Sequence, residues 1–146
     1  MKASLAIFLH SHQYDRLYQA SSIMLTASSM GWSCHLFLFY GALASYVNGT
    51  WDEVNVEACE SDLPRAVRPP WLKELAYGFE KHNFPSLYDM LEKARKEQGG
   101  VKVLACSTSC KVLNLATHEV RERVDEVVGL PTMMQIAEGT THVMYL

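Results

Sequence analysis

The segment "SLAIFLH", residues 4–10, is an almost continuous apolar run instead of an alternation of apolar and polar residues. Such a run is typical of a strand that is covered on both faces, as the strands of parallel sheets are. Two other segments have the same character, "SCHLFLFYG" at residues 33–41 and "VKVLACS" at residues 101–107. These three segments predict buried strands of a parallel sheet.

Helical segments separate the predicted strands. Apolar residues recur at helical spacing over residues 14–30, and Gly31 follows where a C-terminal glycine belongs. The other predicted helices are residues 42–49, 71–79, 85–98 (with Pro85 in its first position), 110–115, 117–124 and 131–139, and further strands are predicted at 124–130 and 141–146. This alternation predicts an α/β fold, a three-layer α/β/α sandwich on a mostly parallel five-stranded sheet.

Length and composition predict a single domain over residues 1–146, with a long irregular excursion at residues 50–70 that is first acidic and then rich in proline and arginine. The net charge of -3 gives no general attraction to nucleic acid or to an anionic membrane. No apolar run approaches the ~18 residues that span a bilayer, and the N-terminal apolar stretch is too short for a signal peptide. We therefore expect a cytoplasmic protein with neither a nucleic acid nor a membrane as partner.

The four cysteines do not have the spacing of a disulfide framework, and the expected state in a reducing compartment is the free thiol. Cys34 lies inside a predicted buried strand and is interpreted as part of the core. Cys59 lies in the excursion and is interpreted as a bystander thiol, with a resolving partner of the site as the alternative. The remaining two, Cys106 and Cys110, flank the end of the third predicted strand.

Ligands of open parallel sheets bind beyond the carboxyl ends of the strands, where Cys106 falls. Ser107, Thr108 and Ser109 can cap the following helix, and Cys110 falls in its first turn. Backbone N–H groups and the helix dipole at such a position favour the thiolate, the nucleophilic form of cysteine. The alternative is that both thiols are small buried hydrophobes.

Two histidines and a tyrosine arrive at the same predicted edge: His10 and His12 after the first strand and Tyr40 after the second. They are candidates for a pocket beside Cys106 and Cys110. The four His and Cys side chains together suggest a small metal-binding protein as an alternative, although their spacing matches no closed zinc site. Signatures of phosphate-binding loops and of a hydrolase nucleophile elbow are absent, and the sequence predicts neither a metal nor a cofactor.

The segment "SLAIFLHSHQYDRLYQASSIMLTASSMGWSCHLFLFYGAL", residues 4–43, resembles the opening of DsrE/DsrF-like proteins. The segment "VKVLACSTSCKVLNLATHEVRERVDEVVGLPTMMQIAEGTTHVMYL", residues 101–146, resembles the second half of that family, in which a strand ends in cysteine. The resemblance implies an α/β/α sandwich that assembles as a trimer or hexamer. It also implies that Cys106 carries sulfur as a persulfide between donor and acceptor proteins of a sulfur relay.

Cys110 stands where relatives often have an apolar residue, so the resemblance gives it no role. From its position alone, Cys110 is a candidate auxiliary thiol that could resolve a persulfide on Cys106. Many members of the family lack the cysteine and serve as structural subunits. The alternative function is therefore a non-catalytic, oligomeric binding or structural protein of the same fold.

Overall fold

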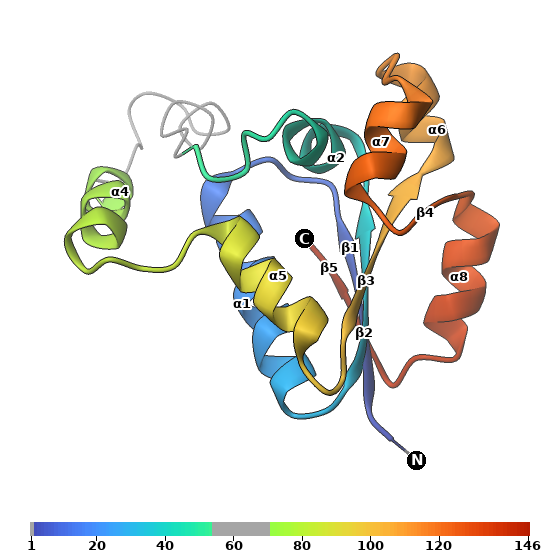
Figure 1. The fold of residues 1–146 in the computed structure, drawn as a ribbon, viewed down its shortest axis with the longest axis horizontal. Coiled ribbons are helices and arrows are strands. Elements are labelled where there is room, and N and C mark those ends of the chain that lie inside the picture. Colours follow the sequence, from blue (N-terminus) through green and yellow to red (C-terminus); the bar gives the residue numbers. More distant parts are fainter. Residues whose placement is uncertain (1, 54–70) are drawn as a thin grey trace.

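The computed structural model describes residues 2–53 and 71–146, with the backbone alone for residues 71–73 and 76. Most of the predicted excursion, Cys59 included, lies outside these described residues. Five strands form one parallel sheet in the order β4-β3-β2-β1-β5 (Figure 1). They are β1 (Ser4–Leu9), β2 (Ser33–Leu38), β3 (Val101–Cys106), β4 (Glu126–Val128) and β5 (His142–Tyr145).

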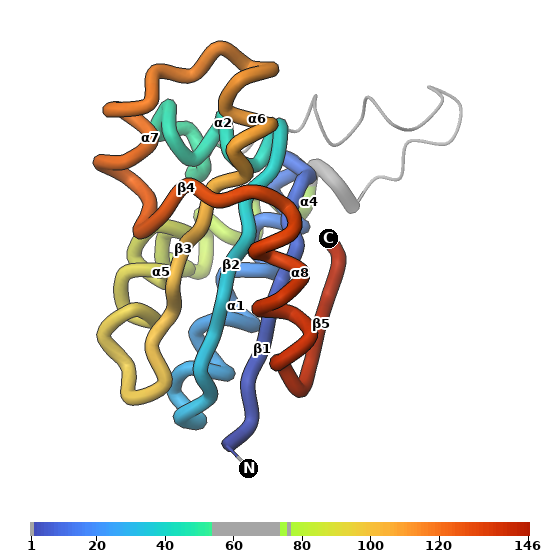
Figure 2. Tube along the Cα trace, turned by 90° about the vertical axis from the view of Figure 1, so that its right-hand side faces the viewer, coloured from blue at the N-terminus to red at the C-terminus, as the bar shows by residue number. Residues whose placement is uncertain are grey.

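Helices lie on both faces of this sheet, which confirms the predicted α/β sandwich. The described helices are α1 (Tyr14–Ser29), α2 (Tyr40–Val47), α4 (Trp71–Lys81), α5 (Leu87–Lys96), α6 (Ser107–Val112), α7 (Thr117–Arg123) and α8 (Leu130–Glu138). The helices α1 and α5 cover one face and α8 covers the other (Figure 1). Figure 2 shows α2, α6 and α7 gathered at one end of the sheet, beyond the carboxyl ends of the strands.

Side chains alternate between the two faces along each strand, so the sheet has two apolar clusters. In β1, Leu5 and Ile7 belong to the cluster under α1 and α5, whereas Phe8 belongs to the cluster under α8. The α1-side cluster is the larger one and continues beyond the strand ends to the fully buried Trp51. Its indole N–H donates to the carbonyl of Ala42 at 3.1 Å, which ties the segment after α2 to that helix.

Turn residues explain where two of the helices end or begin. Gly31 has φ of +81° and its N–H donates to Ser28 O at 2.9 Å, as a glycine after a helix does. The predicted start of α5 at Pro85 is wrong, because Ser86 caps the helix by accepting a hydrogen bond from the Asp89 N–H at 3.0 Å. Pro85 therefore lies before the cap, where its missing N–H has no helical role.

β5 lies at one edge of the sheet and pairs with β1 across almost the whole chain. Ser4 and Thr141 exchange hydrogen bonds, with the Ser4 N–H donating to Thr141 Oγ1 at 2.8 Å and the Thr141 N–H donating to Ser4 Oγ at 3.0 Å. Farther along, Tyr145 stacks on Phe8 with ring centroids 4.9 Å apart, yet 68% of Tyr145 remains exposed. β5 thus carries apolar surface at the rim of the sheet.

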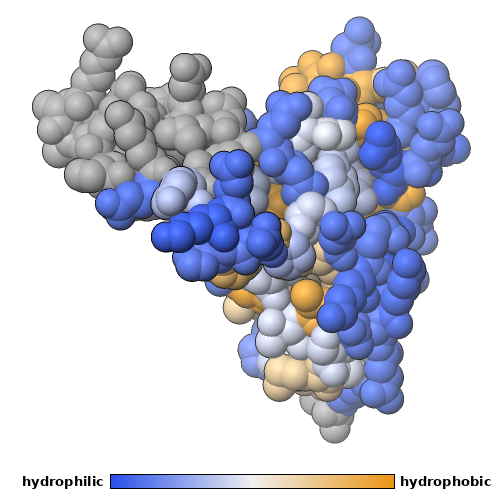
Figure 3. Space-filling model, turned by 60° about the vertical axis from the view of Figure 1, so that its left-hand side comes forward, coloured by the Kyte–Doolittle hydropathy of each residue, from blue (hydrophilic) through white to orange (hydrophobic). Residues whose placement is uncertain are grey.

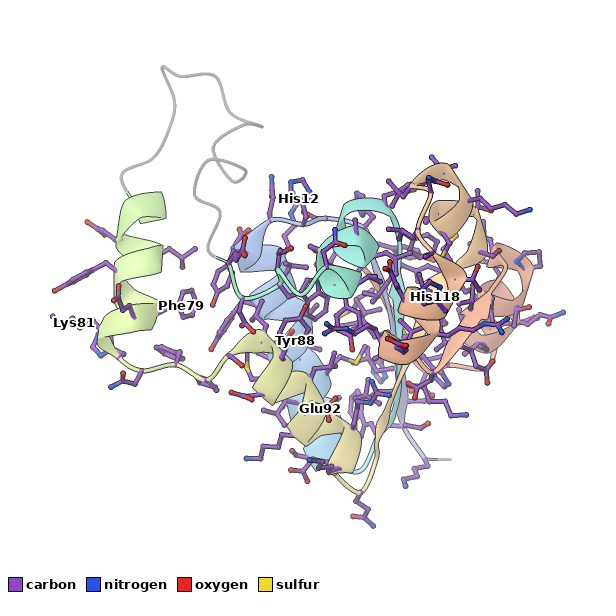
Figure 4. All side chains as sticks on the ribbon, turned by 45° about the horizontal axis from the view of Figure 1, so that its top comes forward. His12, Phe79, Lys81, Tyr88, Glu92 and His118 are labelled. Carbon is purple, nitrogen blue, oxygen red and sulfur yellow. The ribbon has the colours of Figure 1, made fainter. Side chains whose placement is uncertain are left out.

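α4 stands to one side of the sandwich (Figure 1). Figure 4 shows Phe79 pointing from this helix toward the rest of the molecule, where its ring lies 4.4 Å from Tyr18 and 5.3 Å from Phe84. On the face in Figure 3, hydrophilic side chains predominate and the apolar ones form separate patches. In the part of the chain that the structure describes, every helix is too short or too polar to traverse a bilayer.

Candidate functional site

Cys106 is the last residue of β3, as the sequence predicted, but its side chain faces an apolar cluster. It is only 4% exposed and belongs to the cluster under α8, together with Phe8, Phe37, Leu104, Met133 and Ala137. α6 begins at Ser107, so the N-cap position belongs to Cys106, whose sulfur makes no capping hydrogen bond to the described first turn. α6 therefore starts three residues before the predicted helix start at Cys110, and Ser107, Thr108 and Ser109 lie at its N-terminus.

Ser107, Thr108 and Ser109 form the first turn of α6. Thr108 is exposed and Ser107 is partly exposed, whereas Ser109 is completely buried. The Ser109 hydroxyl has no hydrogen-bond partner among the described residues. Ser107 lies close to the start of α8, since a Cβ added to Gly129 would lie 3.9 Å from its Oγ.

Cys110 is the more accessible of the two thiols. It is partly buried, packs against the α1-side cluster, and lines a cavity of about 360 Å³. Burial raises the pKa of the Cys110 thiol, and the charge of Cys106 raises it further. Because a raised thiol pKa lowers the thiolate fraction at neutral pH, Cys110 is not an activated nucleophile of the low-pKa kind.

The two thiols are near enough to interact electrostatically, yet they pack against different clusters. Both are free thiols, Cys106 on the α8 side and Cys110 on the α1 side. The third described cysteine, Cys34, is buried in β2 as expected and donates to Trp32 O at 3.4 Å. Burial raises the pKa of Cys34 to about 11, so this thiol is a part of the core.

The histidines and Tyr40 of the predicted pocket lie at the same edge of the sheet, around α2. β1 ends at Leu9, so His10 and His12 follow the strand as predicted, and His10 Nδ1 lies 2.7 Å from the carbonyl oxygen of Leu146. His12 packs on the first turn of α2, where a Cβ added to Gly41 would lie 2.8 Å from its Nδ1. Figure 4 shows His12 at this end of the molecule.

Tyr40 has a backbone conformation that the sequence did not predict. It is the first residue of α2 and has φ of +40°, in the region that bulky side chains rarely adopt. Half of its surface is exposed. Strained residues of this kind often occur at functional sites, and a tyrosine gives no sequence signal for a positive φ.

The metal-binding alternative has no support in the described geometry. Within residues 2–53 and 71–146, no three His, Cys, Asp or Glu side chains are arranged to hold a metal ion. His10 contacts Leu146 and His12 packs against α2, whereas Cys106 and Cys110 lie at the N-cap and within α6.

Sequence reasoning missed the side chains that surround Cys110. Lys111, Asn114 and Thr117 line its cavity together with Ser107. Asn114 has φ of +51° and follows α6, and the next N–H, of Leu115, donates back to Cys110 O at 3.0 Å. An asparagine after a short helix is a known C-terminal signal, so this turn could have been found from the sequence.

No protein-family model and no curated protein matches the chain.

Proposed function

We propose that this protein is a sulfane-sulfur carrier, which holds sulfur as a persulfide on a cysteine at the junction of β3 and α6 and passes it to the thiol of a partner protein. The observation that supports this function best is the position of Cys106 and Cys110. Both are free thiols, Cys106 at the end of β3 and Cys110 in α6, at the carboxyl edge of a parallel sheet, where ligands of such folds bind. The resemblance to DsrE/DsrF-like proteins supports the same function for Cys106.

Carriage of sulfur needs two exchange steps. A cysteine thiol takes the outer sulfur of a donor persulfide, so that the donor S–S bond breaks, a new S–S bond forms on the protein, and the donor leaves as a thiol. The acceptor thiol then removes that sulfur, and the protein returns to its starting thiol. Neither step changes the number of electrons in the system, and each proceeds through attack by a thiolate.

Loading with inorganic polysulfide tests this function. We expect native protein to gain about 32 Da per chain, the mass of one sulfur atom, as measured by intact mass spectrometry, and to lose it again to an excess of added thiol. The variant in which Cys106→Ser and Cys110→Ser are combined should not gain this mass. Cys34→Ser is the matched control and should load like the wild type. Loading of the double variant to the wild-type level would exclude the junction as the carrier site.

The burial of Cys106 supports a second candidate function, a non-catalytic oligomeric subunit of the same fold. With 4% exposure, this thiol is covered by α8 and by the side chains beneath it. Titration of native protein with a small thiol reagent separates the two functions. Reaction of neither Cys106 nor Cys110 under native conditions would favour the structural subunit.

Two further parts of the proposal concern assembly and location. We place the protein in the cytoplasm, where thiols stay reduced, and we expect a trimer or hexamer. Exposed apolar side chains at Leu130, Met134 and Tyr145, on α8 and β5, support such an assembly. Light scattering after size exclusion measures the mass directly, and a monomer at micromolar concentration would contradict the assembly.

A further inference from the structure

The cavity beside Cys110 has the size and lining of a small ligand site. Its volume is about 360 Å³, which is near the lower end of the range for pockets that hold small molecules. The lining combines the Cys110 thiol with the polar side chains of Ser107, Asn114 and Thr117. Cys106 is not among the residues that line it, so the cavity offers access to only one thiol of the pair.

The wall of this cavity is fixed by the backbone of the turn that ends α6. The N–H groups of Leu113 and Leu115 donate to Ser109 O and Cys110 O, both at 3.0 Å. The backbone N–H of Asn114, which lies between these two residues, donates to Lys111 O at 3.1 Å. The carbonyls of Ser109, Cys110 and Lys111 therefore each accept a hydrogen bond, which fixes the turn beside the Cys110 side chain.

The charge of the lining indicates which ligands it favours. Lys111 is the one charged residue among those that form the described cavity, and it is exposed on the rim. An ammonium group beside a small polar cavity attracts anions and raises their local concentration. Hydroxyl and amide groups, such as those of Ser107, Thr117 and Asn114, can orient a bound carboxylate or peptide group.

We propose that this cavity binds a low-molecular-mass anionic persulfide, and that Cys110 Sγ is the atom that accepts its outer sulfur. The inference rests on the proposed function and gives it a substrate class and an accepting thiol. The Cys110 thiol and the donor persulfide become a Cys110 persulfide and a free donor thiol: the donor S–S bond breaks, a new one forms on Cys110, and the Cys110 proton goes to the leaving thiolate.

The raised pKa of Cys110 is compatible with this role. A thiol of higher pKa has a smaller thiolate fraction, but each thiolate is a stronger nucleophile. Sulfur acceptance at Cys110 should therefore accelerate with pH up to and beyond the ordinary thiol pKa. Cys106 is closed off by the apolar cluster under α8, so in the native protein a small donor reaches Cys110 first.

The experiment uses full-length protein with glutathione persulfide as the anionic probe, and peptide mapping by mass spectrometry locates the added sulfur. In the wild type we expect the sulfur on the peptide that contains Cys110. Cys110→Ser should load about tenfold more slowly or not at all, whereas Cys106→Ser should stay within about twofold of the wild type. Urea midpoints of the variants show whether each one is folded.

Lys111→Gln keeps both thiols and changes an exposed side chain, so it does not depend on the folding of a core variant. It should slow loading by the anionic probe about threefold and leave loading by the persulfide of N-acetylcysteamine, a neutral probe, unchanged. Two results would show that Cys110 is not the accepting thiol of an anionic persulfide, although the proposed function would stand. One is loading of Cys110→Ser on Cys106 at the wild-type rate. The other is an equal slowing of loading by the anionic and the neutral probe in Lys111→Gln. If wild-type protein loads on neither thiol, the proposed function itself fails.

Discussion

On one face of the sheet α1 and α5 lie side by side, whereas α8 is the one described helix that covers the opposite face (Figure 1). Each face holds a buried cysteine: Cys34 is 2% exposed on the α1 side, and Cys106 is 4% exposed on the α8 side. The two thiols are almost equally buried, but two helices cover the face that holds Cys34 and one described helix covers the face that holds Cys106. Access to Cys106 therefore depends on a single helix, while access to Cys34 requires opening of the main core.

The largest effect on stability is expected on the face that α1 and α5 cover. Trp51→Ala removes a fully buried indole from the α1-side cluster, with its hydrogen bond to Ala42 O and its ring contacts to Tyr46 and Tyr88. We expect a loss of about 3–5 kcal/mol in the free energy of unfolding, measured by urea denaturation. Phe84→Ala, at a half-exposed ring, is the control and should cost far less. Equal losses would show that Trp51 is not part of the main core.

Two neighbouring methionines of α8 test the face that this single helix covers. Met133 is fully buried in the cluster that contains Cys106, whereas Met134 is 50% exposed. Met133→Ala should cost about 2 kcal/mol, at the lower end for buried methionine because a single helix can settle into the cavity. It should also speed labelling of Cys106 in native protein, followed by peptide mass mapping. Met134→Ala should change neither the stability nor the labelling rate, and faster labelling in both variants would show that access to Cys106 does not depend on the packing of Met133.

A smaller effect on stability is expected where α5 contacts the β3–β4 edge of the sheet. Asp125 accepts from the Val103 N–H at 2.7 Å with one oxygen and from Arg95 at 2.6 Å with the other. Asp125→Leu should cost about 1–2 kcal/mol, because the strand N–H and the guanidinium both lose their partner. Arg95→Gln keeps the bond to Val103 and should cost under about 1 kcal/mol. A loss in Arg95→Gln as large as in Asp125→Leu would mean that the ion pair, and not the strand contact, stabilises this edge.

The smallest effect is a pH dependence on the α8 side of the sheet. Burial lowers the pKa of His35 below 6.5, and the charge of Lys102 lowers it further. The unfolded chain then binds the proton more readily than the folded one, so this histidine contributes stability above its unfolded pKa that is lost as the pH falls below that value. We expect the urea midpoint to drop between about pH 7.5 and pH 5.5 by a larger amount in the wild type than in His35→Gln. An identical drop in both would exclude His35 as the cause.

The strands and the long helix α1 could be predicted because continuous apolar runs and helical periodicity are local signals. The position of Cys106 at a strand end was predictable for the same reason. The cover over its side chain was not, because it depends on which face the distant helix α8 crosses. The start of α5 was misplaced since Pro85 and Ser86 both suit a helix start, and only the hydrogen bond to Asp89 decides between them.

The surroundings of the second thiol were harder still to predict. The cavity beside Cys110 exists because the chain turns back at Asn114 and brings residues on both sides of that turn together. The positive φ of Tyr40 has no signal in the sequence, since a tyrosine is not a residue that favours this conformation.

The pairing of β5 with β1, fixed by Ser4 and Thr141, has a consequence for the protein during its synthesis on the ribosome. The ribosome makes β3 and Cys106 well before residues 130–145, which supply α8 and the edge strand. Contacts between residues 137 positions apart close late, because the chain must lose the entropy of a very long loop. The nascent chain therefore presents Cys106 on an uncovered sheet face until residues 130–145 emerge, and during that interval this thiol depends on a reducing environment to stay unoxidised.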